Sequence, residues 1–396
     1  MNQEQLGYLK PVIQKEIDAG EIVGAAIRVI HENETVYEER LGYADREKEL
    51  LMAGDTIYRL FSMTKPITAA AVMILLERGQ LQLLAPVSDY LEGFRNQKVW
   101  TEQGLVDTVR EVTLQDLLNM TSGVAYPDEG FEVGRLMGKL FSDVDQEVKN
   151  GNQVSTIDFC NRIGRVPLEF QPGDRWRYGA SADILGAVIE VASGKKLGDF
   201  LKEEIFEPLG MKDTAFYVPE EKLNRFAANY QFNQLTGKLE VFKDRFLCLE
   251  DCILPPTFES AGAGLYSTVE DYSRFALMLA NGGSYQGIRI LGHKTVEYMS
   301  APQLSREQAI TYNWDTQYGY SYGNLMRSLV DPVKGVTNGT VGEFGWDGWT
   351  GNYFFIDPKE KLVVIYMIQR CAGGNPILIR RLRQIIYSSL NCYRLY

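Results

Sequence analysis

Residues 62–79 are the stretch that most constrains the fold of this chain. Ser62 suits the start of a helix, Pro66 is tolerated only in a first turn, and Gly79 ends the segment. Apolar residues recur between them at helical spacing and cover almost every face, which indicates a helix packed inside a large core. The apolar run ends near Leu76, well short of the roughly 20 residues that a bilayer requires. We therefore expect a buried helix and no membrane span.

The residues that open this segment, Ser62-Met63-Thr64-Lys65, place a hydroxyl and an amine on one face of the helix. Burial and the positive end of the helix dipole both disfavour the ammonium form, so we expect a lowered pKa for Lys65. A neutral amine can act as a general base on the serine. The same short pattern also occurs by chance in many helices. Because the chain has only two histidines, a serine whose base is a lysine is still the most economical catalytic interpretation.

Further segments accompany this pair. Residues 171–179 (QPGDRWRYG) indicate a Pro-Gly turn and an aromatic strand or loop before a helix at 181–192, and residues 344–352 (FGWDGWTGN) indicate a glycine-laced strand that a ligand can approach closely. Together with residues 113–123 (TLQDLLNMTSG) and 262–268 (GAGLYST), this set resembles the β-lactamase and penicillin-binding-protein superfamily of serine enzymes. The resemblance covers residues 22–369 and is strongest to the class C-like branch, in particular to its carboxylesterases.

The resemblance implies a role for each matching residue. Ser62 matches the nucleophile, Lys65 its general base, and Tyr178 the tyrosine that relays protons between the lysine, the serine and the leaving group. The backbone N–H groups of Ser62 and Trp349 match the oxyanion hole, which stabilises the tetrahedral intermediate through fixed dipoles. For Tyr178 alone, a packed core tyrosine would be the simpler interpretation without its flanking Pro-Gly and Trp context.

Departures from the family pattern favour ester chemistry. Ala180 stands where many lactam-handling members carry an asparagine, and Trp346 stands where the K-T-G motif supplies a lysine. That lysine helps to hold the carboxylate of a β-lactam or of a D-Ala-D-Ala peptide, so its loss weakens the antibiotic and cell-wall interpretations. Each nearby aromatic taken singly would be expected in the core, but as a group they could receive an apolar acyl or alcohol group. The predicted substrate-binding residues are Tyr126, Trp176, Trp346, Asp347 and Gly348.

Residues 319–323 (GYSYG) match the nucleophile-elbow pattern of α/β-hydrolases. However, the region around Ser321 alternates like a β-strand, no good helix follows it, and both His31 and His293 precede it in the chain. We therefore expect no Ser-His-Asp triad, no histidine-ligated metal site and no cofactor. An odd number of scattered cysteines and a polar N-terminus suggest reduced thiols and a cytoplasmic address. These cysteines are Cys160, Cys248, Cys252, Cys371 and Cys392.

These observations predict a serine carboxylesterase whose partner is a small-molecule ester or acyl donor. An acyltransferase that passes the acyl group to a small-molecule alcohol or amine is an alternative, as is a β-lactamase or D-aminopeptidase. A catalytically silent binding or regulatory relative that keeps the fold is a further alternative. The net charge of −11 argues against binding to nucleic acid or to anionic membranes. No feature of the sequence indicates an oligomeric state.

Strands expected near both ends of the chain predict the architecture. Two strands, at 22–31 and 34–43, follow a helix at 5–19, and two more, at 353–357 and 362–369, precede a final helix at 376–390. This arrangement predicts an antiparallel sheet assembled from both ends of the chain, with a mainly helical region inserted between them. The superfamily fold implies the same α/β (α+β) organisation, with a sheet domain of residues 1–80 plus 255–396, an inserted domain of residues 81–254, and the active site in the cleft between them. Residues 128–154 would form an excursion that could cover the site.

Overall fold

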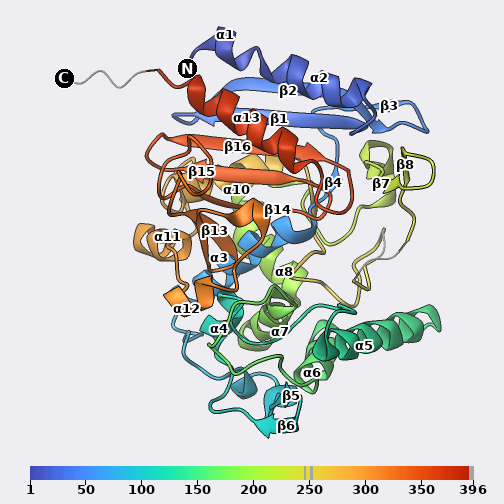
Figure 1. Ribbon diagram of the computed structural model, residues 1–396, viewed down its shortest axis with the longest axis vertical. Coiled ribbons are helices and arrows are strands. Elements are labelled where there is room, and N and C mark those ends of the chain that lie inside the picture. The colour runs from blue at the N-terminus through green and yellow to red at the C-terminus, as the bar shows by residue number, and fades with distance from the viewer. Residues whose placement is uncertain (245–246, 250–252, 392–396) are drawn as a thin grey trace.

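The structure, a computed structural model, describes residues 1–244, 247–249 and 253–391. Its main element is an eight-stranded antiparallel sheet with the strand order β12-β13-β14-β15-β16-β1-β2-β3 (Figure 1). The N-terminal strand β1 (Gly24–His31) lies between β2 (Glu34–Asp45) and β16 (Leu362–Ile368), so that the two ends of the chain meet inside one sheet. The predicted antiparallel sheet is therefore confirmed. Its other strands are β3 (Leu50–Leu51), β12 (Tyr320–Gly323), β13 (Met326–Leu329), β14 (Phe344–Asp347) and β15 (Tyr353–Asp357).

Both faces of this sheet are covered by helices. The helices α1 (Gln3–Leu6), α2 (Leu9–Asp18) and α13 (Pro376–Ser388) pack on one face, and α3 (Thr64–Glu77) and α10 (Val269–Ala280) lie on the other (Figure 1). Alternate residues of β1 consequently belong to two different hydrophobic cores, Ala25 and Ile27 to one and Ala26 and Ile30 to the other. Burial on both faces explains why this strand is apolar on both sides, except at Arg28, and does not alternate between apolar and polar residues.

Helix α3 runs through the centre of the molecule, as predicted. Every residue from Thr64 to Leu75 is buried, and a 3₁₀ turn over Phe61–Met63 precedes the helix. Gly79 follows its end with a φ of 68°, a left-handed conformation that glycine adopts without strain. The helix packs against α7 (Ser181–Ser193) of the inserted region and against α11 (His293–Ser300).

The inserted region lies mostly below the sheet in Figure 1, and one hydrophobic core continues from the sheet into it. The hairpin of β7 (Tyr230–Asn233) and β8 (Lys238–Val241) lies beside the sheet, because Tyr230 exchanges backbone hydrogen bonds of 2.8 and 2.7 Å with Gln369 and Cys371. The region's other elements are α4 (Leu114–Leu118), α5 (Glu132–Lys149), α6 (Thr156–Gly164), α8 (Leu197–Leu201), α9 (Glu207–Leu209), and the hairpin of β5 (Lys98–Thr101) and β6 (Gly104–Asp107). Short elements outside it are β4 (Tyr58–Arg59), β9 (Tyr266–Ser267), β10 (Ser284–Tyr285), β11 (Ile288–Arg289) and α12 (Arg306–Ala309).

Two predicted elements differ from the structure. The single helix expected at 5–19 is two helices, α1 and α2, because Pro11 cannot donate to the carbonyl of Gly7 and is tolerated only in the first turn of a new helix. The strand expected over 344–352 ends at Asp347. A tight turn follows, closed by a 2.7 Å hydrogen bond from the N–H of Gly348 to the carbonyl of Asn352.

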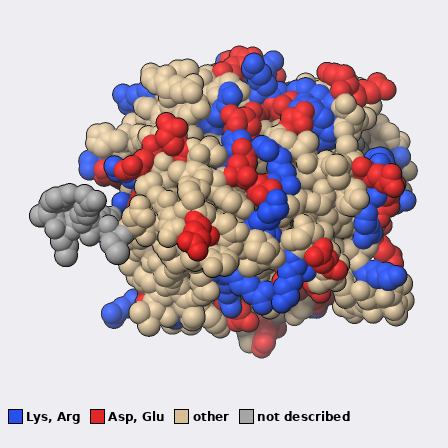
Figure 2. Space-filling view, turned by 90° about the horizontal axis from the view of Figure 1, so that it is seen from above, with Lys and Arg blue, Asp and Glu red and all other residues tan. Residues whose placement is uncertain are grey.

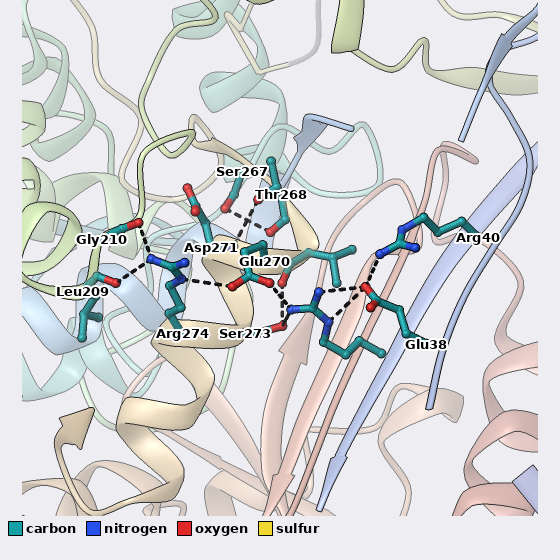
Figure 3. Close-up of polar contacts among 12 residues, drawn as sticks. Glu38, Arg40, Leu209, Gly210, Ser267, Thr268, Glu270, Asp271, Ser273 and Arg274 are labelled. Carbon is teal, nitrogen blue, oxygen red and sulfur yellow. Dashed lines mark hydrogen bonds and ion pairs between the residues drawn. The ribbon is translucent and has the colours of Figure 1, made fainter. Parts of the chain in front are cut away.

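A network of charged side chains joins the sheet to α10 and to the inserted region (Figure 3). Arg28 of β1 forms ion pairs with Glu38 of β2 and with Glu270 in the first turn of α10. Arg274, one turn further along α10, pairs with Glu270 and donates a 2.7 Å hydrogen bond to the carbonyl of Gly210, which ends α9. These contacts fix the positions of the sheet, α10 and the end of α9 relative to one another.

The outer surface carries both signs of charge. Figure 2 shows Lys and Arg interspersed with Asp and Glu over one face of the molecule, so that this face presents no field of a single sign. Among the residues that the structure describes, none of the helices has the length and apolar character needed to cross a membrane.

Candidate active site

Ser62 lies in the 3₁₀ turn that leads into α3. The residue before it, Phe61, has a φ of 45°, which is a strained conformation for a bulky side chain. The Phe61 ring packs edge-on against Trp349, with 5.3 Å between ring centroids. Phe61 and Met63 are buried while Ser62 is only half-buried, so the serine is the accessible residue of this turn.

Lys65 is fully buried one turn along from Ser62. Its Nζ lies 2.8 Å from the carbonyl oxygen of Gly262, 3.2 Å from the hydroxyl of Tyr126 and 3.3 Å from Oγ of Ser62. Burial lowers the pKa of Lys65 to about 7, against the opposing effect of the negative charges on Asp183 and Asp347. A large fraction of the amine is therefore uncharged at neutral pH and can accept a proton from the serine.

Tyr178 completes the hydrogen-bonded group. Its phenol is hydrogen-bonded to Ser62 and accepts a 3.2 Å hydrogen bond from Nε1 of Trp346. The Lys65 amine lies 4.7 Å from the centroid of the Tyr178 ring. Burial raises the pKa of Tyr178, although its two hydrogen bonds act in the opposite direction. The tyrosine is therefore a neutral phenol that can pass a proton between the lysine, the serine and a leaving group.

Asp183 organises the loop that contacts Lys65, a role that sequence analysis missed. This buried carboxylate of α7 accepts hydrogen bonds from Oγ of Ser260 at 2.6 Å and from the N–H of Gly262 at 3.0 Å. A Cβ atom on Gly262 would lie 2.9 Å from both Asp183 and Tyr126, so only glycine fits there. The sequence did contain a signal, because Asp183 lies among apolar residues in the first turn of a mostly apolar helix, and a buried carboxylate requires partners.

The five predicted substrate-binding residues lie around the group formed by Ser62, Lys65 and Tyr178, but they differ in their exposure and contacts. Tyr126 bonds to Lys65, Trp346 is fully buried beneath Tyr178, and Trp176 is buried with its ring stacked 6.1 Å from that of Tyr178. Asp347 is half-exposed and pairs with Arg327 at 3.3 Å. Gly348 lies in the turn after β14, where a Cβ atom would be 2.5 Å from the carbonyl of Leu60.

Sequence analysis also missed Trp314. Its ring packs edge-on against both Trp176 and Tyr178, with 5.1 Å between centroids in each pair. The indole is partly exposed, so it forms the outer wall of the aromatic group beside the tyrosine. Its segment, residues 313–318, carries none of the family motifs, which explains why no pattern pointed to it.

Two cavities lie near the hydrogen-bonded group, although Ser62, Lys65 and Tyr178 themselves line neither of them. One, of about 260 Å³, is lined by Phe61, which precedes Ser62, and by Ala263 and Gly264, which follow the carbonyl that Lys65 contacts. The second, of about 370 Å³, is lined by Trp314, whose ring packs on Tyr178, and by Asp347.

The other residues considered from the sequence lie elsewhere. Ser321 lies in β12, which is followed directly by β13, so the predicted strand is confirmed and the strand-to-helix elbow of α/β-hydrolases is absent around it. His31 ends β1 and His293 begins α11. Cysteines Cys160 and Cys371 are buried, Cys248 is half-buried, and Cys252 and Cys392 lie outside the described residues.

Known proteins resemble this chain over nearly its whole length. The family model described as Beta-lactamase matches residues 9–385. Esterase EstB of Burkholderia gladioli is 30% identical over 397 residues, which span 96% of this chain and 94% of the esterase. Among solved structures, EstCE1, a hydrolase with promiscuous acyltransferase activity, superposes with a TM-score of 0.80 at 24% identity and covers 97% of this chain and 99% of its own. Unliganded simvastatin synthase (LovD) from Aspergillus terreus superposes with a TM-score of 0.81 at 23% identity and covers 99% of both chains. The predicted β-lactamase/transpeptidase-like fold is confirmed.

Proposed function

Because this chain belongs to the Beta-lactamase family, we propose that it is a serine carboxylesterase that cleaves small-molecule esters through an acyl-enzyme on Ser62. One observation carries the proposal. The buried amine of Lys65, with a pKa lowered to about 7, lies 3.3 Å from Oγ of Ser62 and inside a hydrogen-bonded group that includes Tyr178. This arrangement supplies both a nucleophile and the base that activates it.

In the first half-reaction, Oγ of Ser62 attacks the ester carbonyl carbon while the neutral amine of Lys65 accepts the serine proton. The backbone N–H groups of Ser62 and Trp349 stabilise the negative charge that develops on the carbonyl oxygen. The tetrahedral intermediate collapses when the carbon–oxygen bond to the alcohol breaks. Tyr178 then donates its proton to the departing alkoxide and regains one from the Lys65 ammonium.

In the second half-reaction, a water molecule attacks the acyl carbon of the acyl-enzyme. Tyr178 passes its phenolic proton to the neutral Lys65 as it accepts a proton from the water, and the second tetrahedral intermediate forms. When the bond to Oγ of Ser62 breaks, the Lys65 ammonium donates a proton to the serine oxygen and the carboxylic acid leaves. The lysine and the tyrosine end the cycle in the protonation states in which they began it.

The residue at position 346 supports an ester over a β-lactam or a D-Ala-D-Ala peptide. The buried indole of Trp346 offers no positive charge to a substrate carboxylate, and its single donor is used by Tyr178. Asp347, which follows it in β14, is an acidic residue paired with Arg327 at 3.3 Å, so it offers no positive charge to such a group either. The similarity to esterase EstB points in the same direction.

The test is intact-mass spectrometry of the protein after exposure to p-nitrophenyl acetate and to nitrocefin, followed by peptide mapping of the adduct. We expect a transient acetyl adduct on Ser62, its loss in Ser62→Ala, and near wild-type ester turnover in the matched variant Ser321→Ala. Nitrocefin turnover at a rate comparable with ester turnover would contradict the proposal. If a fluorophosphonate fails to label Ser62 in the folded protein, the chain is a silent relative instead. Product that depends on an added alcohol and forms at the expense of free acid would identify an acyltransferase.

A further inference from the structure

The two cavities differ in their relation to the proposed proton donor. Tyr178 gives its proton to the leaving alcohol, and the larger cavity begins at Trp314, whose ring packs on Tyr178. In the proposed mechanism, the alcohol half of an ester would lie on that side. The cavity of about 260 Å³ is lined by Phe61, whose ring contacts Trp349, the residue that we assign to the oxyanion hole. The acyl half, whose carbonyl oxygen would point to that hole, would lie on this second side.

Most of the wall of this acyl-side cavity is carbon. Val144 and Val148 come from α5, so the excursion that the sequence predicted over 128–154 does border the cavity. Aromatic rings line much of the remaining wall, together with the charged side chains of Arg59, Lys243 and Asp244. A wall of this kind favours a branched or aromatic acyl group over a short polar one. Besides Phe61, the rings among the described lining residues are those of Phe216, Phe242, Phe258 and Tyr266.

One buried polar group in this wall has an unmet hydrogen-bonding requirement. Asn229 is only 5% exposed, and among the residues that the structure describes its Oδ1 has no hydrogen-bond partner. A buried amide oxygen without a partner destabilises a fold by about 1–3 kcal/mol, so such groups in native proteins require an explanation. A ligand group that bonds to this amide provides one.

The backbone around Asn229 is held rigidly, so the amide is preorganised. The N–H of Ala228 donates to the carbonyl of Ala44 at 2.9 Å, and the N–H of Tyr230 donates to the carbonyl of Gln369 at 2.8 Å. The carbonyl of Asn229 itself accepts a 2.8 Å hydrogen bond from Phe242. With three consecutive residues anchored, binding a ligand at the side chain requires little additional ordering.

We propose that this cavity binds the acyl group and selects carbon-rich, branched or aromatic acyl groups that carry a hydroxyl bonded to the side chain of Asn229. A hydroxyl can donate to the amide oxygen or accept from the amide nitrogen, so it suits the amide in either orientation. The inference rests on the proposed esterase function and adds to it the class of acyl group.

The experiment compares two matched p-nitrophenyl esters, the 3-(4-hydroxyphenyl)propanoate and the 3-phenylpropanoate, which differ only in the hydroxyl. The wild-type protein should show a kcat/KM about tenfold or more higher for the hydroxylated ester, because a buried polar group discriminates strongly against a substrate that leaves it unpaired. Asn229→Leu should reverse the ratio or reduce it to about one. The matched control Asn152→Leu, at an exposed asparagine just after α5, should keep the wild-type ratio.

A second variant acts on the cavity and not on the amide. Val148→Trp should fill the space from the side of α5 and lower kcat/KM for both arylpropanoates relative to p-nitrophenyl acetate by about tenfold or more. Equal rates for the two arylpropanoates in the wild type, or an unchanged ratio in Asn229→Leu, would overturn the inference. If Ser62 still reacts with a fluorophosphonate and p-nitrophenyl acetate is still hydrolysed, such a result would overturn only the proposed acyl-group selectivity and not the esterase function. Loss of Ser62 labelling in the wild type would instead overturn the proposed function.

Discussion

The indole Nε1 of Trp346 lies 3.2 Å from the phenolic oxygen of Tyr178 and donates a hydrogen bond to it. Trp346 is fully buried, and it lies at the position where the family pattern supplies a lysine. The tryptophan therefore orients the residue that relays protons in the proposed mechanism. This relationship gives the first prediction.

Replacing Trp346 with Phe should lower kcat for p-nitrophenyl acetate by about fivefold while KM changes less. The variant keeps an aromatic ring in the core but removes the donor that orients Tyr178, and a hydrogen bond of this kind contributes about 1 kcal/mol. Steady-state kinetics measures the effect. The control is Tyr322→Phe, because the Tyr322 ring packs edge-on against Trp346 at 5.0 Å while its hydroxyl has no partner among the described residues. Equal losses in the two variants would show that packing alone, and not the hydrogen bond, is responsible.

The rate should depend on pH through Lys65. The amine must be neutral to act as a base, and burial lowers its pKa to about 7, so kcat/KM should rise with pH through about 7 and level off above it. The carboxylate of Asp183 favours the ammonium form, so Asp183→Asn should move this rising limb to lower pH. A pH–rate profile of both proteins measures the shift. A limb that moves to higher pH in Asp183→Asn would contradict the electrostatic assignment.

Gly179, next to Tyr178, should not tolerate a side chain. A Cβ atom there would lie 2.1 Å from the carbonyl oxygen of Val124, so Gly179→Ala must displace the backbone that carries the tyrosine. A misplacement of this kind can lower a rate by about 100-fold. The control is Gly138→Ala within α5, where the nearest atom would be 3.9 Å away. That change should stabilise the helix by about 0.5–1 kcal/mol. Ester turnover and thermal melting of both variants provide the comparison.

The buried ion pair between Glu343 and Arg383 should contribute strongly to the free energy of unfolding, because it joins the sheet to α13. Glu343 is fully buried, accepts hydrogen bonds of 2.8 and 2.7 Å from the guanidinium, and accepts another from Tyr387 at 2.6 Å. Glu343→Gln leaves the cation buried without its partner and should lower the free energy of unfolding by about 3–5 kcal/mol. Urea unfolding measures this difference. Glu32→Gln, which breaks an exposed pair with Lys361, should leave the unfolding midpoint unchanged.

The large elements of the fold followed from local patterns. Strand β15 begins and ends where the sequence predicted, and α3 was recognised because apolar residues on every side require a core around them. The break between α1 and α2 was missed, although Pro11 signals it. Element boundaries of this kind depend on single residues, whereas the existence of a long element depends on many.

The grouping of Ser62, Lys65 and Tyr178 could be proposed in advance, because a helix places residues three positions apart on one face and because the motif around Tyr178 is distinctive. The contacts of Lys65 with Tyr126 and Gly262 could not be predicted. Its closest contact, Gly262, lies 197 positions away in the chain, and Asp183 reaches that loop from a third element. No local periodicity encodes such a contact.

By itself, the sequence of this protein determined which segments had to be buried and which side chains could carry acyl-transfer chemistry, because hydrophobic periodicity and short motifs act within a few residues. Only the tertiary structure decided the pKa of Lys65, the use of Trp346 as a donor to Tyr178, and the unpaired amide of Asn229 in a cavity beside Phe61. Each of these depends on desolvation or on hydrogen bonds between segments far apart in the chain, and both arise only when the core closes around them.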